Sequence, residues 1–387
     1  MSTSATGGGT RKRRPFLPLV LSLCVLVGCD TSAQATSDSG RPDSVEELLP
    51  GELETPPLSH PLTQAPRART NGLDPELLEE ALARAASLPR LYNMIIARHG
   101  EIEVERHFRG PGPTASANVK SVSKSLLSAL VGIAVAEGYL EGLDQPIMPS
   151  FRDYLPEEPE AARSRITLRH LLTMQSGLES TSFNNYGRWV TSSNWVRYAL
   201  TRPMIDEPGE RMVYSTGNSH LISALLTKAT GESTLAFART HLSEPLGVQL
   251  PPWPTDPQGI YFGGNDMQMS PRALFRFGEL YRNGGSQDGR QIVPEEWVEE
   301  SWKVHGRSPR NGDAYGLGWW GRESHGYSVH FGWGYGGQFL FIVPALELTV
   351  VFTSDPVSPR EGPHNRAVHD LLDELVVPAA IQGKPSP

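Results

Sequence analysis

Residues 121–137 read SVSKSLLSALVGIAVAE, and this stretch decides the fold. From Leu126 onward almost every position is apolar or small, so a helix over 121–137, ended by Gly138, would be apolar on nearly all sides. Such a helix is predicted to lie buried in the core rather than on the surface. Ser121 and Lys124 stand at positions i and i+3 at its start, which places the hydroxyl and the amine on one face.

This serine and lysine have the chemistry of an activated nucleophile. Free N–H groups at a helix N-terminus favour an alkoxide at Ser121 and a nearby oxyanion. A lysine held against an apolar helix has its charged form disfavoured, so Lys124 could accept a proton near neutral pH. Taken alone, the tetrapeptide is equally consistent with Ser121 as a helix cap and Lys124 as a solvated side chain.

Other familiar catalytic patterns are missing from the chain. It has no G-x-S-x-G, no H-E-x-x-H and no P-loop sequence. Residues 332–337 satisfy G-x-G-x-x-G, but a strand pattern follows where a dinucleotide site needs a helix. The histidines are scattered without close pairs at metal-ligand spacing on one helix, which favours a structural role for each.

The patterns on either side of this helix predict how the chain is layered. Before it, two strand-like runs flank a short turn and predict a β-hairpin, and after the middle of the chain come three more strand-like runs and a final amphipathic helix. Between them, roughly residues 140–285 alternate helical patterns with Pro and Gly breaks. The predicted fold class is α/β (α+β): one antiparallel sheet flanked by helices and built from both ends of the chain, plus a mostly helical subdomain. The strand-like runs are residues 91–97, 102–108, 327–330, 338–343 and 346–352, and the final helix is 364–377.

Several stretches in the same order resemble the serine β-lactamase and penicillin-binding protein superfamily over roughly residues 75–380. Ser121-Val-Ser-Lys124 is similar to its S-x-x-K motif. Family-like stretches also occur at residues 143–146, 155–156, 168–178 and 284–294. The resemblance implies the β-lactamase-like fold, no metal or organic cofactor, and Ser121 as nucleophile with Lys124 as its base.

The second motif of this family is Tyr-x-Asn, and Tyr214-Ser215-Thr216 occupies its place. Tyr214 matches the tyrosine that relays protons, so the resemblance implies a catalytic role for it. Thr216 departs from the family's asparagine, which puts the substrate contacts of that position in doubt. Thr216 and the tyrosine Tyr186, in a nearby loop, are candidate substrate-binding residues.

The third motif is normally Lys-Thr-Gly or His-x-Gly, and Tyr335-Gly336-Gly337-Gln338 is the stretch that fits best. Trp333-Gly334 offers a second register. Neither register contains a lysine to hold a substrate carboxylate, but glycines allow close approach of a substrate. Tyr335, Gly336 and Gly337 are candidate substrate contacts, and the N–H groups of Ser121 and Gln338 are the candidate oxyanion hole.

The sequence looks most similar to the branch that contains 6-aminohexanoate-dimer hydrolases and carboxylesterases. The resemblance therefore implies a serine hydrolase that acts on a small-molecule ester or amide through an acyl-enzyme. A D-amino-acid peptidase or a weak β-lactamase is the alternative within the fold. A catalytically silent binding protein of the cell envelope is the alternative of another class.

The N-terminus is typical of a secreted lipoprotein. A basic cluster at residues 11–14 precedes an apolar run too short to span a bilayer, and Leu26-Val27-Gly28-Cys29 resembles a lipobox. These features predict a signal peptide over residues 1–28, lipidation at Cys29, a tether over 29–73 rich in Ser, Thr and Pro, and a hydrolase domain over 74–385. The catalytic domain is then expected outside the cytoplasm, in the bacterial cell envelope, anchored to a membrane by its lipid.

Charge and cysteine content exclude further classes of function. Removing residues 1–28 takes away four basic residues and no acidic one, so the formal charge falls from −8 to −12. An acidic surface repels phosphate backbones, which argues against nucleic acid as a partner. Both cysteines, Cys24 and Cys29, lie in the N-terminal segment, so the folded part has neither a disulfide nor a cysteine nucleophile.

Overall fold

A computed structural model describes residues 72–155, 160–357 and 361–383, all of which belong to the compact unit Gln64–Pro387. The predicted signal peptide, Cys29 and nearly all of the predicted tether lie outside the described residues. The α-helices are α1 Pro75–Ser87, α2 Ser123–Ala136, α3 Met148–Phe151, α4 Ala161–Ser164, α5 Leu168–Leu172, α6 Tyr186–Val190, α7 Trp195–Leu200, α8 Thr216–Thr230, α9 Thr234–Ala238, α10 Pro271–Arg282, α11 Glu295–Trp302, α12 Glu361–Leu371 and α13 Val377–Gln382.

The strands and the shorter helical turns complete the list of elements. The strands are β1 Leu91–Arg98, β2 Glu101–His107, β3 Ala117–Asn118, β4 Gln268–Met269, β5 Ser286–Gln287, β6 Arg290–Gln291, β7 Gly306–Arg307, β8 Ala314–Tyr315, β9 Trp320–Ser324, β10 Tyr327–Gly334, β11 Gln338–Val343 and β12 Leu348–Ser354. The 3₁₀ and π turns are η1 Lys120–Val122, η2 Arg152–Tyr154, η3 Phe183–Asn185, η4 Arg239–Ser243, η5 Pro344–Leu346 and η6 Leu372–Val376.

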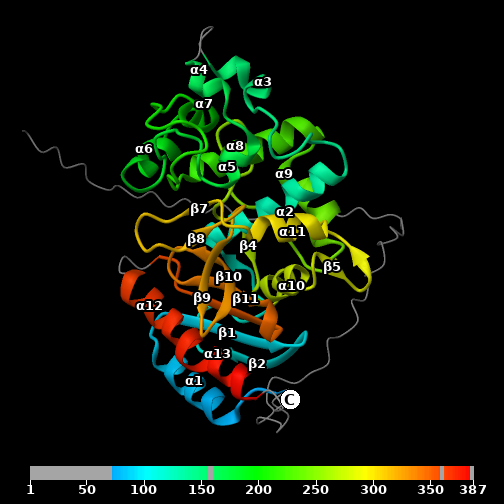
Figure 1. Ribbon diagram of the computed structural model, residues 1–387, viewed down its shortest axis with the longest axis vertical. Coiled ribbons are helices and arrows are strands. Elements are labelled where there is room, and N and C mark those ends of the chain that lie inside the picture. Colours follow the sequence, from blue (N-terminus) through cyan, green and yellow to red (C-terminus); the bar gives the residue numbers. More distant parts are fainter. Residues whose placement is uncertain (1–71, 156–159, 358–360, 384–387) are drawn as a thin grey trace, which may run out of the picture. The chain divides into compact units, whose positions relative to one another are not determined.

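The main sheet joins the two ends of the folded region. Its strand order is β2-β1-β12-β11-β10-β9-β8-β7. From β2 to β9 in this order, each strand pairs with its neighbour in the antiparallel direction. The N-terminal hairpin pairs directly with the last strand, with Ile95 opposite Val351. Figure 1 shows these strands side by side, coloured blue-green and orange. The predicted sheet built from both ends of the chain is confirmed.

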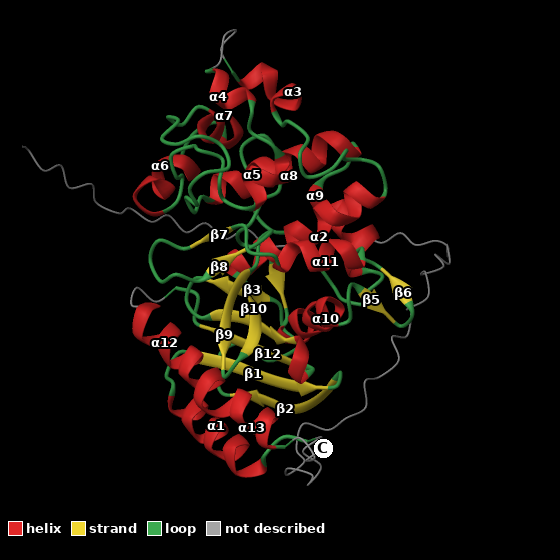
Figure 2. Ribbon diagram, viewed as in Figure 1, coloured by secondary structure: helices red, strands yellow, loops and turns green. Residues whose placement is uncertain are grey.

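Side chains of the central strands alternate between two apolar layers. On β1, Ile95 packs in the layer that contains α2, α10 and α11, whereas Met94 and Ile96 pack in the layer that contains α1, α12 and α13. This alternation follows from the two-residue repeat of a strand. Because helices cover both faces (Figure 2), β11 and β12 are buried along their whole length.

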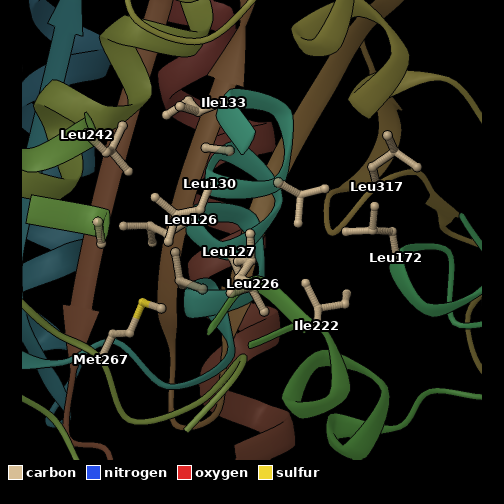
Figure 3. Packing of buried hydrophobic residues seen from close by; sticks show 14 of the residues in the cluster. Leu126, Leu127, Leu130, Ile133, Leu172, Ile222, Leu226, Leu242, Met267 and Leu317 are labelled. Atoms are coloured by element: carbon tan, nitrogen blue, oxygen red, sulfur yellow. The ribbon is translucent and has the colours of Figure 1, made fainter. Parts of the chain in front are cut away.

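Helix α2 is buried, as its composition predicts. Leu126, Leu127 and Leu130 are almost inaccessible, and Figure 3 shows them packed against side chains from several other segments, including Ile222 and Met267. The helix begins at Ser123 rather than at the predicted residue 121. The preceding residues form the 3₁₀ turn η1 instead, because Lys120 has a left-handed backbone with a φ of 51°.

Helix α2 also connects the sheet to the predicted helical region. It contacts α8, which in turn packs against α5 and α7, and it contacts β10 of the sheet on another side. Helix α10, at the end of the helical region in the chain, packs on β11 and β12 of the sheet. The first turn of α2 therefore lies where the two parts of the fold meet. Within the described ranges, no helix is both long and apolar enough to cross a bilayer.

The contact between α2 and α11 makes a prediction about stability. A Cβ added at Gly132 would lie 2.5 Å from the Trp297 ring. Helix propensity alone favours Ala over Gly by about 1 kcal/mol, but overpacking against an indole costs about 1–3 kcal/mol. Gly132→Ala should therefore lower the free energy of unfolding, measured by denaturant titration. Gly187 is the control, because a Cβ there meets nothing within 4 Å, and Gly187→Ala should raise the free energy of unfolding. If both substitutions changed this free energy in the same direction, the packing of Gly132 against Trp297 would be contradicted.

Candidate active site

The nucleophile candidate lies in a tight, strained turn. Ser121 is the middle residue of η1, directly after Lys120, whose left-handed backbone is unfavourable for a residue with a side chain. Two local hydrogen bonds hold this conformation: the Lys120 N–H donates to Asn118 Oδ1 at 2.8 Å, and Ser123 Oγ donates to the Lys120 carbonyl at 2.5 Å. Strain maintained in this way is typical of functional sites.

The predicted meeting of Ser121 and Lys124 is present in the structure. Lys124 Nζ lies 3.0 Å from Ser121 Oγ, within hydrogen-bond distance. The same amine donates to the Gly264 carbonyl at 2.6 Å and lies 3.4 Å from Thr216 Oγ1. Three oxygen atoms from three separate segments therefore surround the amine.

Burial changes the proton affinity of this lysine. Lys124 is 3% exposed, and burial lowers the pKa of its amine to about 7, while the negative charge of Asp266 acts weakly in the other direction. A substantial fraction of the amine is therefore neutral at physiological pH. Neutral Lys124 can take the proton of Ser121. The solvated lysine that the tetrapeptide also allowed is excluded by this burial, and the catalytic role of the pair stays a prediction.

Tyr214 approaches the same lysine from the helical side. Lys124 Nζ lies 5.0 Å from the centre of the Tyr214 ring. The ring stacks on Trp320 of β9 at a centroid separation of 5.9 Å and meets Tyr315 of β8 edge to face. Aromatic packing thus fixes the plane of the phenol beside the amine.

A segment that sequence reasoning did not single out holds Tyr214 and Thr216 in place. Ser180 Oγ donates to the Tyr214 carbonyl at 2.7 Å, and Thr181 Oγ1 accepts from the Gly217 N–H at 2.7 Å. Ser182 Oγ accepts from the Thr216 N–H at 2.9 Å. Hydroxyl side chains in the run Ser-Thr-Ser would have been the signal, but such runs are also common in ordinary loops.

Thr216 is more enclosed than a residue open to substrate. It is 5% exposed, and its hydroxyl lies 3.0 Å from Ser182 Oγ as well as near Lys124. Its role in the structure is thus to support the lysine. The substrate contact expected at this position stays a prediction.

The glycine-rich turn between β10 and β11 presents its two registers differently. A Cβ at Gly334 would lie 2.3 Å from the Val119 carbonyl. This glycine therefore packs directly against the nucleophile turn, which is η1 together with the preceding Val119. Gly336 and Gly337 have left-handed backbones, with φ of 86° and 97°, and a Cβ on them would meet residues 354–356 and His364 instead. Gly334 therefore lies against Val119 and Lys120, directly before Ser121, whereas Gly336 and Gly337 lie against other segments.

The remaining residues of this turn have separate environments. Tyr335 is 43% exposed and thus available at the surface. Gln338 pairs with Gly334 across the hairpin, while its side-chain amide donates to the Ser354 carbonyl at 2.8 Å. The oxyanion role of the Gln338 N–H and the substrate contacts of Tyr335, Gly336 and Gly337 stay predictions.

Tyr186 is tied to a second segment that sequence reasoning missed, residues 263–267. Its hydroxyl accepts from Asn265 Nδ2 at 2.8 Å, and burial, together with the charge of Asp266, raises its pKa to about 12. Tyr186 therefore stays protonated and acts at most as a neutral contact. Its expected role in substrate binding stays a prediction.

Residues 263–267 clamp the nucleophile turn from outside. Gly264 binds Lys124, and Asp266 Oδ1 accepts from Asn118 Nδ2 at 2.6 Å and from Lys120 Nζ at 3.1 Å. The Val119 N–H donates to the Met267 carbonyl at 3.0 Å. The pair Gly263-Gly264 was the visible signal in the sequence, but it is equally typical of a turn.

No metal centre competes with this arrangement in the part of the chain that the structure describes. There, no three His, Cys, Asp or Glu side chains lie close enough together to hold an ion. The site instead consists of a serine, a buried amine and a phenol, connected by hydroxyl and carbonyl groups.

The family described as Beta-lactamase matches residues 92–373 of this chain. The chain belongs to the Beta-lactamase family. The matched range contains the nucleophile turn, Tyr214 and the glycine-rich turn, so the resemblance noted from the motifs is confirmed. Family membership and the relatives below identify the chain as a hydrolase with the β-lactamase fold.

Relatives of this Beta-lactamase family member include a dimer hydrolase and an esterase. The chain is 23% identical over 310 residues to a 6-aminohexanoate-dimer hydrolase of Paenarthrobacter ureafaciens, covering 73% of this chain and 76% of the relative. It is 25% identical over 178 residues to Esterase EstB of Burkholderia gladioli, covering 40% and 45%. A penicillin-binding protein homologue from Caulobacter crescentus has the same fold, with a TM-score of 0.64, 16% identity, and coverage of 81% and 99%.

The buried lysine predicts a pH-dependent cost in stability. Its folded pKa of about 7 lies below the unfolded value of 10.5, so the unfolded state binds more protons between these pH values. The cost is complete below pH 7 and fades as the pH rises toward 10.5. Lys124→Met should therefore stabilise the protein more at pH 6 than at pH 9, by about 2–3 kcal/mol in the free energy of unfolding.

Denaturant titration of both proteins at the two pH values measures this difference. Lys228 is exposed on α8, so Lys228→Met is the matched control and should show the same change at both pH values. An equal gain for Lys124→Met at pH 6 and pH 9 would mean that Lys124 titrates normally.

Proposed function

We propose that the chain is a serine hydrolase that cleaves ester or small amide bonds through an acyl-enzyme on Ser121. The observation that carries the proposal is the 3.0 Å contact between Ser121 Oγ and Lys124 Nζ, in surroundings that lower the pKa of the amine to about 7. The names of the relatives, a dimer hydrolase and an esterase, support this class of substrate.

In the acylation step, neutral Lys124 takes the proton of the Ser121 hydroxyl as Oγ attacks the substrate carbonyl carbon. The carbonyl π electrons move to oxygen and form a tetrahedral oxyanion, for which the N–H groups of Ser121 and Gln338 are the proposed donors. The oxyanion collapses, the bond to the leaving group breaks, and Tyr214 donates a proton to the departing oxygen or nitrogen. The proton on Lys124 then restores the phenol.

In the deacylation step, water attacks the acyl carbon on Ser121. Neutral Lys124 accepts the proton of that water and passes it to Ser121 Oγ, which leaves as the acid product forms. Each proton removed in one step returns in the next, so the cycle needs no metal and no redox partner. This scheme uses two proton-handling groups that come from separate segments and lie near each other, the Lys124 amine and the Tyr214 phenol.

The absence of a cation in the glycine-rich turn supports uncharged esters and small amides as the substrate class. Residues 333–338 contain no cation, and the nearby Lys120 is already paired with Asp266. A substrate that depends on a carboxylate clamp, such as a β-lactam, would lose a charge-assisted contact of about 1.5–3 kcal/mol, or roughly ten- to a hundred-fold. Uncharged esters and small amides lose nothing by this absence.

The nucleophile is tested by Ser121→Ala. This variant should lose covalent labelling by an active-site-directed phosphonate and at least about 10³-fold of its p-nitrophenyl acetate turnover, because the acyl-enzyme cannot form. The exposed Ser164 provides the control, and Ser164→Ala should behave as wild type. Mass spectrometry that finds the phosphonate on another serine would reject the assignment.

The roles of the two proton-handling residues are tested with leaving groups of different basicity. An alkoxide or amine needs a proton as it departs, whereas p-nitrophenolate leaves with little help. Tyr214→Phe should therefore reduce turnover of alkyl esters and amides by about 10²-fold and affect p-nitrophenyl esters much less. Lys124→Ala should reduce turnover of every substrate.

Tyr139 offers a matched control for that experiment. It is exposed and contacts Phe237 and His241 in the helical region, so Tyr139→Phe should leave all rates unchanged. Wild-type turnover of alkyl esters by Tyr214→Phe would make Tyr214 a packing residue.

The cellular location is proposed from the N-terminal sequence. Leu26-Val27-Gly28-Cys29 after a basic and apolar lead supports a lipid anchor at Cys29 and a catalytic domain in the cell envelope. The mature protein should partition into the detergent phase, and its N-terminal peptide should carry the mass of the lipid. Cys29→Ser should abolish both results and Cys24→Ser neither; a wild-type protein in the aqueous phase would refute the anchor.

A further inference from the structure

A buried imidazole–carboxylate pair lies next to the active site but has no role in the proposed reaction. His220 of α8 and Asp256 have side chains that are fully inaccessible, and His220 Nε2 lies 3.0 Å from Asp256 Oδ2. Aromatic rings enclose the imidazole, from Trp189, Trp195 and Phe262. Burying such a pair in apolar surroundings is expensive compared with apolar residues of similar size. Its presence therefore calls for a function.

The hydrogen bonds of the pair define which nitrogen of His220 carries a proton. Asp256 Oδ2 accepts only, so Nε2 carries the hydrogen of this contact. In the neutral imidazole the other nitrogen, Nδ1, is then an acceptor, and the Gly263 N–H donates to it at 3.3 Å. Asp256 is itself held by the N–H groups of Gln258 and Ile260, at 2.8 and 2.9 Å from Oδ1.

The backbone of Gly263 and Gly264 connects this pair to Lys124. A Cβ on Gly263 would lie 2.2 Å from the Ser219 carbonyl, and one on Gly264 would lie 2.8 Å from Lys124 Cγ. The peptide is therefore pressed between α8 and the lysine side chain. The Gly264 carbonyl, one residue after the N–H bound by His220, accepts from Lys124 Nζ at 2.6 Å.

We infer that His220 and Asp256 are positioning residues that hold the Gly264 carbonyl against Lys124 Nζ and thereby set the orientation and proton affinity of the amine. The consequence for catalysis rests on the proposed role of Lys124 as base. The hydrogen bonds of the pair reach neither Ser121 nor Lys124 directly. The pair acts through the backbone of Gly263 and Gly264.

Other charged and titratable groups around the amine act independently of this pair. Asp266 faces it from the same loop, Tyr214 from the segment before α8, and Lys120, paired with Asp266, from η1. All three keep their places if only the Gly264 carbonyl turns away. A carbonyl oxygen favours the ammonium form, so its loss lowers the proton affinity of Lys124.

Asp256→Asn separates these effects with little change in shape. The amide oxygen can still accept from the backbone of residues 258 and 260, but its NH₂ faces His220 Nε2. The imidazole then has two choices, and each brings two donors face to face. It can carry its hydrogen on Nδ1, where it faces the Gly263 N–H, or keep it on Nε2, where it faces the new NH₂ group. We expect the acid limb of the pH profile of kcat/KM to move down by about one pH unit and the plateau to fall about ten-fold.

A direct measurement of the lysine does not depend on activity. The chain has six lysines, so ¹³C-labelled lysine gives few Cε signals, and Lys124→Met assigns the one of interest. Its NMR titration midpoint should be lower in Asp256→Asn than in wild type. Glu279→Gln, which alters a buried carboxylate paired with Arg282 away from the site, should not move the midpoint.

The outcomes separate this inference from the proposed function. If wild type fails to react with the phosphonate, the proposed function fails, but the NMR midpoint still decides the positioning role. An unchanged Lys124 midpoint in folded Asp256→Asn overturns the inference, even if activity falls. A lower midpoint together with a normal one in Glu279→Gln supports it.

A second pair of variants covers the case in which Asp256→Asn does not fold. His220→Gln retains an acceptor and a donor in one side chain, whereas His220→Leu has neither. The Lys124 midpoint and the acid limb should be closer to wild type in His220→Gln than in His220→Leu. Equal values in the two variants would show that hydrogen bonding by residue 220 does not position the lysine.

Discussion

The structure depends on one amine that is removed from water and surrounded by oxygen atoms. Lys124 Nζ contacts Ser121 Oγ, the Gly264 carbonyl and Thr216 Oγ1, and burial brings its pKa to about 7. Taking an ammonium out of water is costly, so the surrounding fold must hold the amine in place. An apolar α2, close packing on both of its sides and a set of backbone hydrogen bonds together meet this requirement.

The position of α2 explains why chemistry gathers at its first turn. The helix lies between the sheet and the helical region, so segments from both reach its start. Tyr214 and residues 180–182 come from the helical side, Gly334 comes from β10, and residues 263–267 close the outer wall. Left-handed backbones at Lys120 and Asp266 show that this junction is held by its neighbours rather than by local preference.

The active site is also supported in layers. Lys124 touches Ser121, the Gly264 carbonyl touches Lys124, and His220, paired with Asp256, accepts from the N–H of the preceding residue, Gly263. The side chains of His220 and Asp256 are fully inaccessible, so the groups farthest from Ser121 meet no solvent. Such surrounding groups can orient a reactive side chain without contacting it.

The amino-acid sequence by itself determined the local features. The i and i+3 spacing of Ser121 and Lys124, the buried helix after them and the alternating strands at both ends follow from short-range periodicity, which is legible along the chain. Tertiary structure alone decided that Ser121 lies in a 3₁₀ turn, that Gly334 packs against Val119 before it, and that Gly264 binds Lys124. The physical reason is that this last contact joins a side chain to a backbone carbonyl 140 residues away. Every residue has such a carbonyl, so only the folded path of the chain selects which one meets the lysine.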